Sequence, residues 1–155
     1  PLYFSQFVGI HLSPQEIEER CMEYSRLVIQ DVIKAPWVPG VLYYLNSNSS
    51  NQHFVLVTGT PRWEIIEILT NLDILDCFQN IYGSPTTKVN AIYQELKSGT
   101  KVQDCLFIGD STTDYEAAKT YQIPFLLRET NDNKKLFLNY SGPRFYNFRN
   151  LNEPS

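Results

Sequence analysis

The sequence lacks the features that define several common classes of protein. Its three cysteines, Cys21, Cys77 and Cys105, show no Cys-x-x-Cys spacing, so neither a disulfide framework nor a zinc site is indicated. Its longest apolar runs, such as 54–57, are far shorter than the roughly 20 residues of a membrane helix. The first ten residues have no basic flank and no continuous apolar core, the marks of a signal peptide. We therefore expect a cytoplasmic protein with reduced thiols and no membrane partner.

Basic charge is also scarce. Thirteen Lys and Arg residues against 17 Asp and Glu residues give a net charge of −4, whereas a nucleic-acid-binding surface needs a basic excess. We therefore expect no nucleic-acid partner. What the sequence does have is length and apolar content, because its 155 residues are 43% hydrophobic. That composition is too apolar for a disordered chain and sufficient for one packed core.

The first part of the chain predicts one long amphipathic helix. Ser13 and Glu16 have the spacing of a capping box, and Pro14 stands at the first helical position. Pro36 predicts the end of the helix, because the residue before a proline is disfavoured in helical conformation. Apolar side chains follow at helical spacing between these limits, namely Ile17, Cys21, Tyr24, Val28 and Val32. Next the sequence predicts a turn at Pro39-Gly40, a short apolar stretch at 41–45 and an exposed loop at 46–52.

From residue 53 onwards, predicted strands and helices alternate. The strands are expected at 53–58, 80–83, 105–108, 124–127 and, last, 145–148. Helices are expected from Pro61 onwards with Thr60 as the cap, at 87–97 and around 115–121, with a polar loop at 131–140. This alternation predicts an α/β fold with a parallel sheet and right-handed crossovers.

Polar side chains stand where three of these strands end. Thr58 ends the first strand, Lys88 lies just beyond the second, and Asp110 follows the third, with Asp114 four residues later. Ligands of parallel sheets bind at the carboxyl ends of the strands. A hydroxyl and an ammonium group suit phosphate oxygens, and two carboxylates suit a hard cation such as Mg²⁺. Singly, these residues could be helix caps or solvated surface groups, but the combination predicts a site for phosphate and a divalent cation.

Three segments carry a resemblance to a known family. The segments 54–61 (FVLVTGTP), 82–88 (YGSPTTK) and 106–118 (LFIGDSTTDYEAA) resemble the second, third and fourth motifs of the haloacid dehalogenase superfamily. Their order and spacing are similar to the branch of phosphoglycolate phosphatase and β-phosphoglucomutase. The resemblance implies a Rossmann-like three-layer core with a parallel sheet. On this basis residues 1–36 would be the C-terminal part of a helical cap, and 37–155 a core without its first strand.

The resemblance also implies a role for each site residue. Thr58 and Gly59 would bind phosphoryl oxygens, and Lys88 would neutralise the phosphoryl group in the transition state, so that Thr58 and Lys88 are the catalytic residues. Asp110 would bind Mg²⁺ directly, and Asp114 would bind it through a water molecule or orient such a water. The implied function is a magnesium-dependent phosphohydrolase that acts on a small phosphorylated metabolite through an aspartyl-phosphate. A phosphomutase with the same core motifs is an alternative.

The sequence departs from the family at its first motif. That motif is a strand that ends in Asp-x-Asp and supplies the nucleophile, and no Asp-x-Asp occurs in these 155 residues. One hypothesis is that the nucleophile segment is missing from this sequence, which we favour. The other is a non-catalytic phosphate-binding or regulatory module. On either hypothesis the chain alone is predicted to be inactive. A dinucleotide-binding fold is not indicated, because the sequence has no Gly-x-Gly-x-x-Gly fingerprint after a strand.

The missing strand leads to a structural expectation. In the family it lies between the strand that ends at Thr58 and the strand that ends at Asp110. The loss of a central strand leaves its neighbours roughly 9–10 Å apart. Three outcomes are possible. The two neighbouring strands can pair directly, or a strand from elsewhere or from a second chain can fill the gap. The third outcome, which we favour, is that the missing strand belongs to a segment outside this sequence. We expect both strands in one sheet, with Thr58, Lys88 and Asp110 at one pocket.

Overall fold

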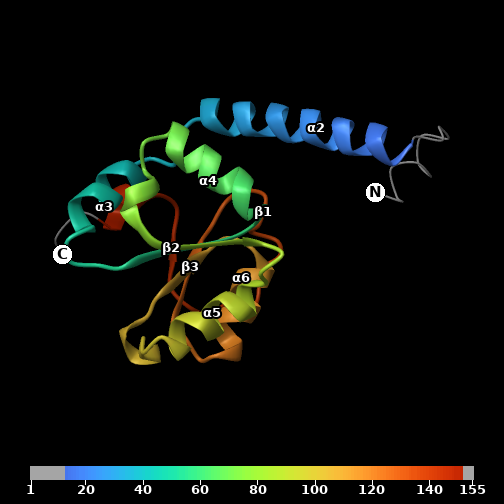
Figure 1. The fold of residues 1–155 in the computed structure, drawn as a ribbon. Helices are drawn as coiled ribbons and strands as arrows, with labels where there is room; N and C mark the ends of the chain where they lie inside the picture. Colours follow the sequence, from blue (N-terminus) through green and yellow to red (C-terminus); the bar gives the residue numbers. More distant parts are fainter. Residues whose placement is uncertain (1–12, 152–155) are drawn as a thin grey trace.

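The computed structural model describes residues 13–151 and contains the predicted alternation of strands and helices (Figure 1). In chain order the elements are α2 (Pro14–Lys34), α3 (Val41–Asn48), β1 (Phe54–Pro61), α4 (Arg62–Asn71), β2 (Phe78–Ser84), α5 (Lys88–Lys97), β3 (Phe107–Gly109), α6 (Thr112–Thr120), β4 (Phe125–Arg128) and β5 (Arg144–Phe145). Single turns of 3-10 helix occur at Leu75–Cys77, Val102–Asp104 and Phe148–Leu151. Within residues 13–151, no helix has both the length and the apolar character needed to cross a bilayer.

Helix α2 begins and ends where the sequence predicts. The Glu16 carboxylate accepts the Ser13 N–H at 2.8 Å, and the Ser13 hydroxyl accepts the Glu16 N–H, which completes the capping box. The helix packs against α4 and extends away from the sheets (Figure 1). Its buried residue is Ile29, whereas Tyr24 of the predicted apolar stripe is 70% exposed. The stripe is therefore not the face that packs against the core. Residues 1–12 of the predicted cap segment lie outside the described part.

The segment after α2 differs from the sequence prediction. Residues 41–48 form helix α3, so the first residues of the predicted loop 46–52 are helical. Two contacts explain the difference: Leu45 is buried, and the side-chain amide of Asn48 donates a hydrogen bond to the Tyr44 carbonyl at 2.8 Å. Gly40 precedes the helix with φ of 83°, a left-handed conformation that glycine adopts without steric cost.

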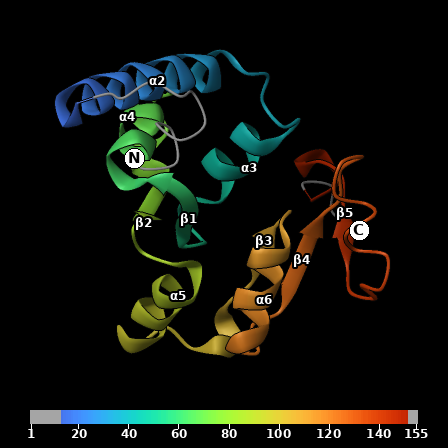
Figure 2. The same ribbon diagram turned by 90° about the vertical axis from the view of Figure 1, so that its right-hand side faces the viewer.

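The strands form two parallel sheets instead of one. Strand β1 pairs with β2, and β3, β4 and β5 pair in that order in a second sheet. Figure 2 shows the two sheets side by side, with β1 and β3 facing the space between them. The expectation that strands 54–58 and 105–109 share one sheet is therefore wrong. The physical reason is that no strand among residues 13–151 lies between β1 and β3, so their facing edges have no partner to join them.

Helices α5 and α6 hold the two halves together. The helices pack against each other, although α5 follows the first sheet and α6 follows β3 of the second. One cluster of buried side chains lies between α6, α5 and the second sheet, and consists of Ile92, Ala117, Ala118, Ile123, Phe125, Leu127 and Phe137. The cluster includes one residue from the predicted polar loop 131–140, Phe137, which is buried. This packing brings the N-termini of α5 and α6 close together, and the candidate site lies there.

Candidate active site

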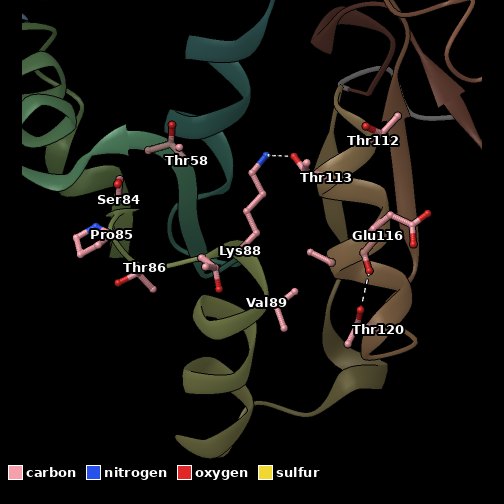
Figure 3. A pocket seen from close by; sticks show the side chains of 13 residues that line it. Thr58, Ser84, Pro85, Thr86, Lys88, Val89, Thr112, Thr113, Glu116 and Thr120 are labelled. Carbon is pink, nitrogen blue, oxygen red and sulfur yellow. Dashed lines mark hydrogen bonds between the residues drawn. The ribbon is translucent and has the colours of Figure 1, made fainter. Parts of the chain in front are cut away.

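Lys88 is the central contact of the site. It is the first residue of α5, directly after Thr87, whose hydroxyl caps the helix by accepting the Asn90 N–H. The Lys88 ammonium group donates to the Asp114 carboxylate at 2.5 Å and to the Thr113 hydroxyl at 3.0 Å. Figure 3 shows the side chain reaching from α5 across to α6. Lys88 therefore links the two halves of the molecule, and its side chain is 22% exposed.

Asp114 uses both carboxylate oxygens in contacts within the protein. Oδ1 accepts from Lys88, whereas Oδ2 accepts from the Ser111 hydroxyl at 2.7 Å and from the N–H groups of Ser111 and Asp110. These bonds include the capping box of α6. Gly109 makes the close approach possible, because a Cβ at that position would lie 2.5 Å from the Asp114 Cβ. The helix-capping role that the sequence allowed is thus present, together with an ion pair.

The Asp110 carboxylate, unlike that of Asp114, is exposed and has few partners. Its side chain is 54% exposed, and one oxygen pairs with the Arg128 guanidinium at 3.3 Å. No other hydrogen bond to this carboxylate is found among the residues that the structure describes. Asp110 lies at an open pocket of about 700 Å³. Besides Asp110 and Arg128, the lining residues come from the segment after β4, namely Thr130, Asn131, Asp132, Asn133 and Leu136.

Thr58 and Gly59 lie on β1, opposite Lys88. The strand continues to Pro61, so α4 begins at Arg62 with Pro61 as its cap, one residue later than predicted. The Thr58 hydroxyl accepts the Thr60 N–H at 3.1 Å and also contacts the Thr60 hydroxyl, which explains why Thr60 does not cap the helix. Gly59 is exposed, and a Cβ there would meet no atom within 4 Å. The backbone at Gly59 is therefore accessible to a ligand.

A pocket of about 550 Å³ brings three of the predicted residues together. Its lining comes from β1, the β2–α5 loop, α5 and α6 (Figure 3), and consists of Thr58, Gly59, Ser84, Pro85, Thr86, Thr87, Lys88, Val89, Thr112, Thr113, Glu116, Ala117 and Thr120. Thr58, Gly59 and Lys88 belong to it, whereas Asp110 lines the neighbouring pocket. Asp114 connects the two pockets, since one oxygen contacts Lys88 and the other the Asp110 N–H.

The charges around the site fit a cation that is only partly held by protein. No group of three or more His, Cys, Asp or Glu side chains suited to a metal occurs in the described part of the chain. Mg²⁺ in phosphate-handling sites is commonly held by one or two carboxylates, with water and phosphate oxygens as the other ligands. The exposed carboxylate of Asp110, with Asp114 behind it, meets that requirement.

Sequence reasoning missed several side chains that hold these residues. They are Arg128 at the end of β4 and Thr130 and Asn133 in the segment after it, which has no spacing pattern that points to the site. A second ion pair in this region joins Glu129 and Arg144, and the Tyr146 hydroxyl also donates a hydrogen bond to the Glu129 carboxylate at 3.0 Å. The hydrogen bond from Arg144, with that from Tyr146, holds the pKa of the Glu129 carboxyl below its ordinary value.

Comparison with known proteins identifies the family. The model of the haloacid dehalogenase-like hydrolase family matches residues 4–127. The structure resembles a predicted phosphoglycolate phosphatase from Haemophilus somnus with a TM-score of 0.74 and 19% identity, over 95% of this chain and 70% of that one. It also resembles a haloacid dehalogenase-like hydrolase from Streptococcus pneumoniae, with a TM-score of 0.66 and 24% identity, over 90% and 69%. A third similar structure is a haloacid dehalogenase-superfamily hydrolase of subfamily IA from Geobacter sulfurreducens, with a TM-score of 0.61 and 15% identity, over 79% and 63%. Comparison with curated proteins gave no match.

The α/β arrangement with parallel strands is the Rossmann-like fold of these solved structures. The chain belongs to the haloacid dehalogenase-like hydrolase family. At these identities the solved structures establish the fold, so the substrate and the details of the reaction are matters for proposal.

Proposed function

We propose that the chain works as part of a magnesium-dependent phosphohydrolase that acts on a small phosphorylated metabolite through an aspartyl-phosphate. The observation that carries the proposal is the pocket at which Thr58, Gly59 and the Lys88 ammonium group meet. The Asp-x-Asp motif that supplies the attacking aspartate in such a mechanism does not occur in these 155 residues. The proposal therefore assigns to this chain the binding of the phosphoryl group and of the metal.

Lys88 is the electrostatic element of this proposal. An ammonium group at the N-terminus of a helix stabilises a phosphoryl group, because the helix dipole and its N–H groups also favour negative charge there. The ion pair with Asp114 keeps the flexible lysine in place before a ligand arrives. The Thr58 hydroxyl and the accessible backbone at Gly59 supply further polar contacts from the opposite side of the pocket.

Asp110 would hold Mg²⁺ directly, and Asp114 would act through a water molecule, because its own oxygens already accept four hydrogen bonds. When bound, the metal would neutralise negative charge on the phosphoryl oxygens. In the structure the Arg128 guanidinium pairs with the Asp110 carboxylate at 3.3 Å. This long, exposed ion pair can be replaced by a bond from the carboxylate to another cation.

Inorganic phosphate binding to the chain tests the proposal directly. We expect Lys88→Met to weaken phosphate binding, measured by calorimetry, by about 10- to 100-fold, the effect of losing a hydrogen bond to a charged group. The Asp114 carboxylate that remains would add repulsion. Lys97→Met is the matched control, because Lys97 is the exposed last residue of the same helix. Equal affinities in the two variants would contradict the assignment of Lys88.

The metal assignment has its own test. We expect Asp110→Asn to weaken Mg²⁺ binding, whereas Asp132→Asn, an exposed carboxylate at the same pocket, leaves it nearly unchanged. Both variants remove one negative charge from the same region, so both weaken the long-range attraction for Mg²⁺ to a similar extent. A difference in affinity between them therefore reports direct contact between the Asp110 carboxylate and the metal. Similar losses in both variants would count against Asp110 as a ligand.

A further inference from the structure

The main chain of Asp110 is held on both sides, although its side chain is exposed. The Asp110 N–H donates to Asp114 Oδ2 at 3.3 Å, and the Asp110 carbonyl accepts a hydrogen bond from Asn133 Nδ2 at 2.8 Å. Asn133 is only 6% exposed, in contrast to the Asp110 side chain with 54%. A residue whose backbone is fixed at both ends presents its side chain in a narrow range of directions.

Asn133 uses its whole side-chain amide in these contacts. Nδ2 donates to the Asp110 carbonyl and, at 2.9 Å, to the carbonyl of Arg128. Oδ1 accepts the Thr130 N–H at 2.8 Å, and the Asn133 N–H donates to the Thr130 hydroxyl at 3.2 Å. Both amide hydrogens and the amide oxygen are therefore engaged, so rotation of the buried side chain would break several bonds at once.

These contacts join two segments that carry opposite charges. The loop between β3 and α6 contributes Asp110, and the end of β4 contributes Arg128, the partner of its carboxylate. Asn133 bonds to the carbonyl groups of both residues and so fixes the distance between the two backbones. The Asp110 carboxylate is thus held toward the pocket that it lines with Arg128, Asn131 and Asp132.

We infer that Asn133 is a positioning residue for Asp110, and that it aligns this carboxylate for a divalent cation. The inference rests on the proposed function, in which Asp110 holds the metal. Residues that orient a metal ligand typically change metal affinity by about 10- to 100-fold when they are replaced. Asn133 would act through the main chain of the ligand, without contact to the metal.

The test replaces Asn133 by a residue of the same shape. Asn133→Asp keeps an oxygen for the Thr130 N–H but places a second oxygen against two carbonyl groups, which repel it. The matched control is Asn131→Asp, which adds the same charge at an exposed position of the same segment and pocket. Mn²⁺ affinity is measured by calorimetry at a temperature at which circular dichroism shows both variants folded. Hydrogen exchange of the Asp110 and Ser111 amides is measured on the same samples.

We expect Mn²⁺ affinity to fall about 10- to 100-fold in Asn133→Asp and not to fall in Asn131→Asp. The two amides that Asp114 accepts should exchange at least tenfold faster in Asn133→Asp, while amides within α6 keep their protection. If Asn133→Asp does not fold, Asn133→Ala takes its place, because it removes the donor without adding repulsion. Unchanged affinity in the folded variant, or an equal loss in the control, overturns the inference.

The exchange measurement separates this inference from the proposed function. If the unmodified chain binds no Mn²⁺, the proposed metal site fails. In that case faster exchange of the Asp110 and Ser111 amides in Asn133→Asp alone still supports the positioning of Asp110. Unchanged exchange overturns the positioning as well.

Discussion

Replacement of Asp114 by asparagine is the most informative single change at this site. The substitution keeps the size of the side chain and one acceptor oxygen but removes the negative charge. In the structure Oδ1 of Asp114 accepts from the Lys88 ammonium group at 2.5 Å. Oδ2 accepts three hydrogen bonds, from the Asp110 N–H, the Ser111 N–H and the Ser111 hydroxyl. The change therefore affects two kinds of interaction, the ion pair between α5 and α6 and the cap of α6.

The size of the effect follows from the burial of the two partners. Loss of an N-terminal cap costs about 0.5–2 kcal/mol, and a hydrogen bond to a charged group is worth about 1.5–3 kcal/mol. Asparagine retains part of the cap, and Lys88, with 22% of its side chain exposed, regains some hydration. We therefore expect Asp114→Asn to lower the free energy of unfolding by about 1–3 kcal/mol, more than the value of about 0–1 kcal/mol for a surface ion pair.

Urea unfolding provides the measurement, and a double-mutant cycle isolates the pair. Asp114→Asn, Lys88→Met and the double variant should show a coupling energy of about 1 kcal/mol or more. Glu116→Gln is the matched control, because Glu116 is an exposed carboxylate on the same helix, and its loss should change stability by less than about 0.5 kcal/mol. A loss in Asp114→Asn no larger than in the control would refute the reasoning, as would a coupling energy near zero.

Three further predictions concern other parts of the chain. Gly109→Ala should destabilise the protein by about 1–3 kcal/mol, because its Cβ would overlap the Asp114 side chain, whereas Gly59→Ala should have little effect on the urea midpoint. Glu129→Gln should lower the melting temperature at pH above the ordinary Glu pKa of 4.5. Because the bond with Arg144 lowers the pKa of the folded state, this difference should shrink as the pH falls below that value, and a difference independent of pH would contradict it. Finally, the 155-residue chain should release no phosphate from an aryl phosphate, and activity that copurifies with it would show that another residue attacks.

The parts of the fold that depend on local signals could be predicted from the sequence. The start of α2 follows from Ser13 and Glu16, and its end from Pro36, because capping and proline sterics act over a few residues. The parallel α/β class also follows from the order of strands and helices, and the comparison structures confirm it. The face of α2 that packs was not predictable in this way, since the contact between Ser25 and Glu64 joins residues 39 positions apart.

The division into two sheets could not be predicted from local signals. Each strand was placed from its own residues, but the pairing of β1 with β2 and of β3 with β4 depends on which edges lie next to each other. The same limit applies to Asn133. Its position in a polar segment without a motif predicts a loop, and only the folded chain places its amide against the Asp110 carbonyl.

The sequence presented the two aspartates as alternatives, either helix caps or metal ligands, and the structure shows why these roles need not exclude each other. A carboxylate has two oxygens, and Asp114 directs one to the cap of α6 and the other to Lys88. Its charge is therefore already balanced within the protein. Asp110, held through its main chain and paired loosely with Arg128, keeps a carboxylate that is open to solvent. In the proposed function, the buried Asp114 fixes the lysine that binds phosphate, and the exposed Asp110 exchanges Arg128 for a cation. The two roles then call for two acids of different exposure on one strand-to-helix turn.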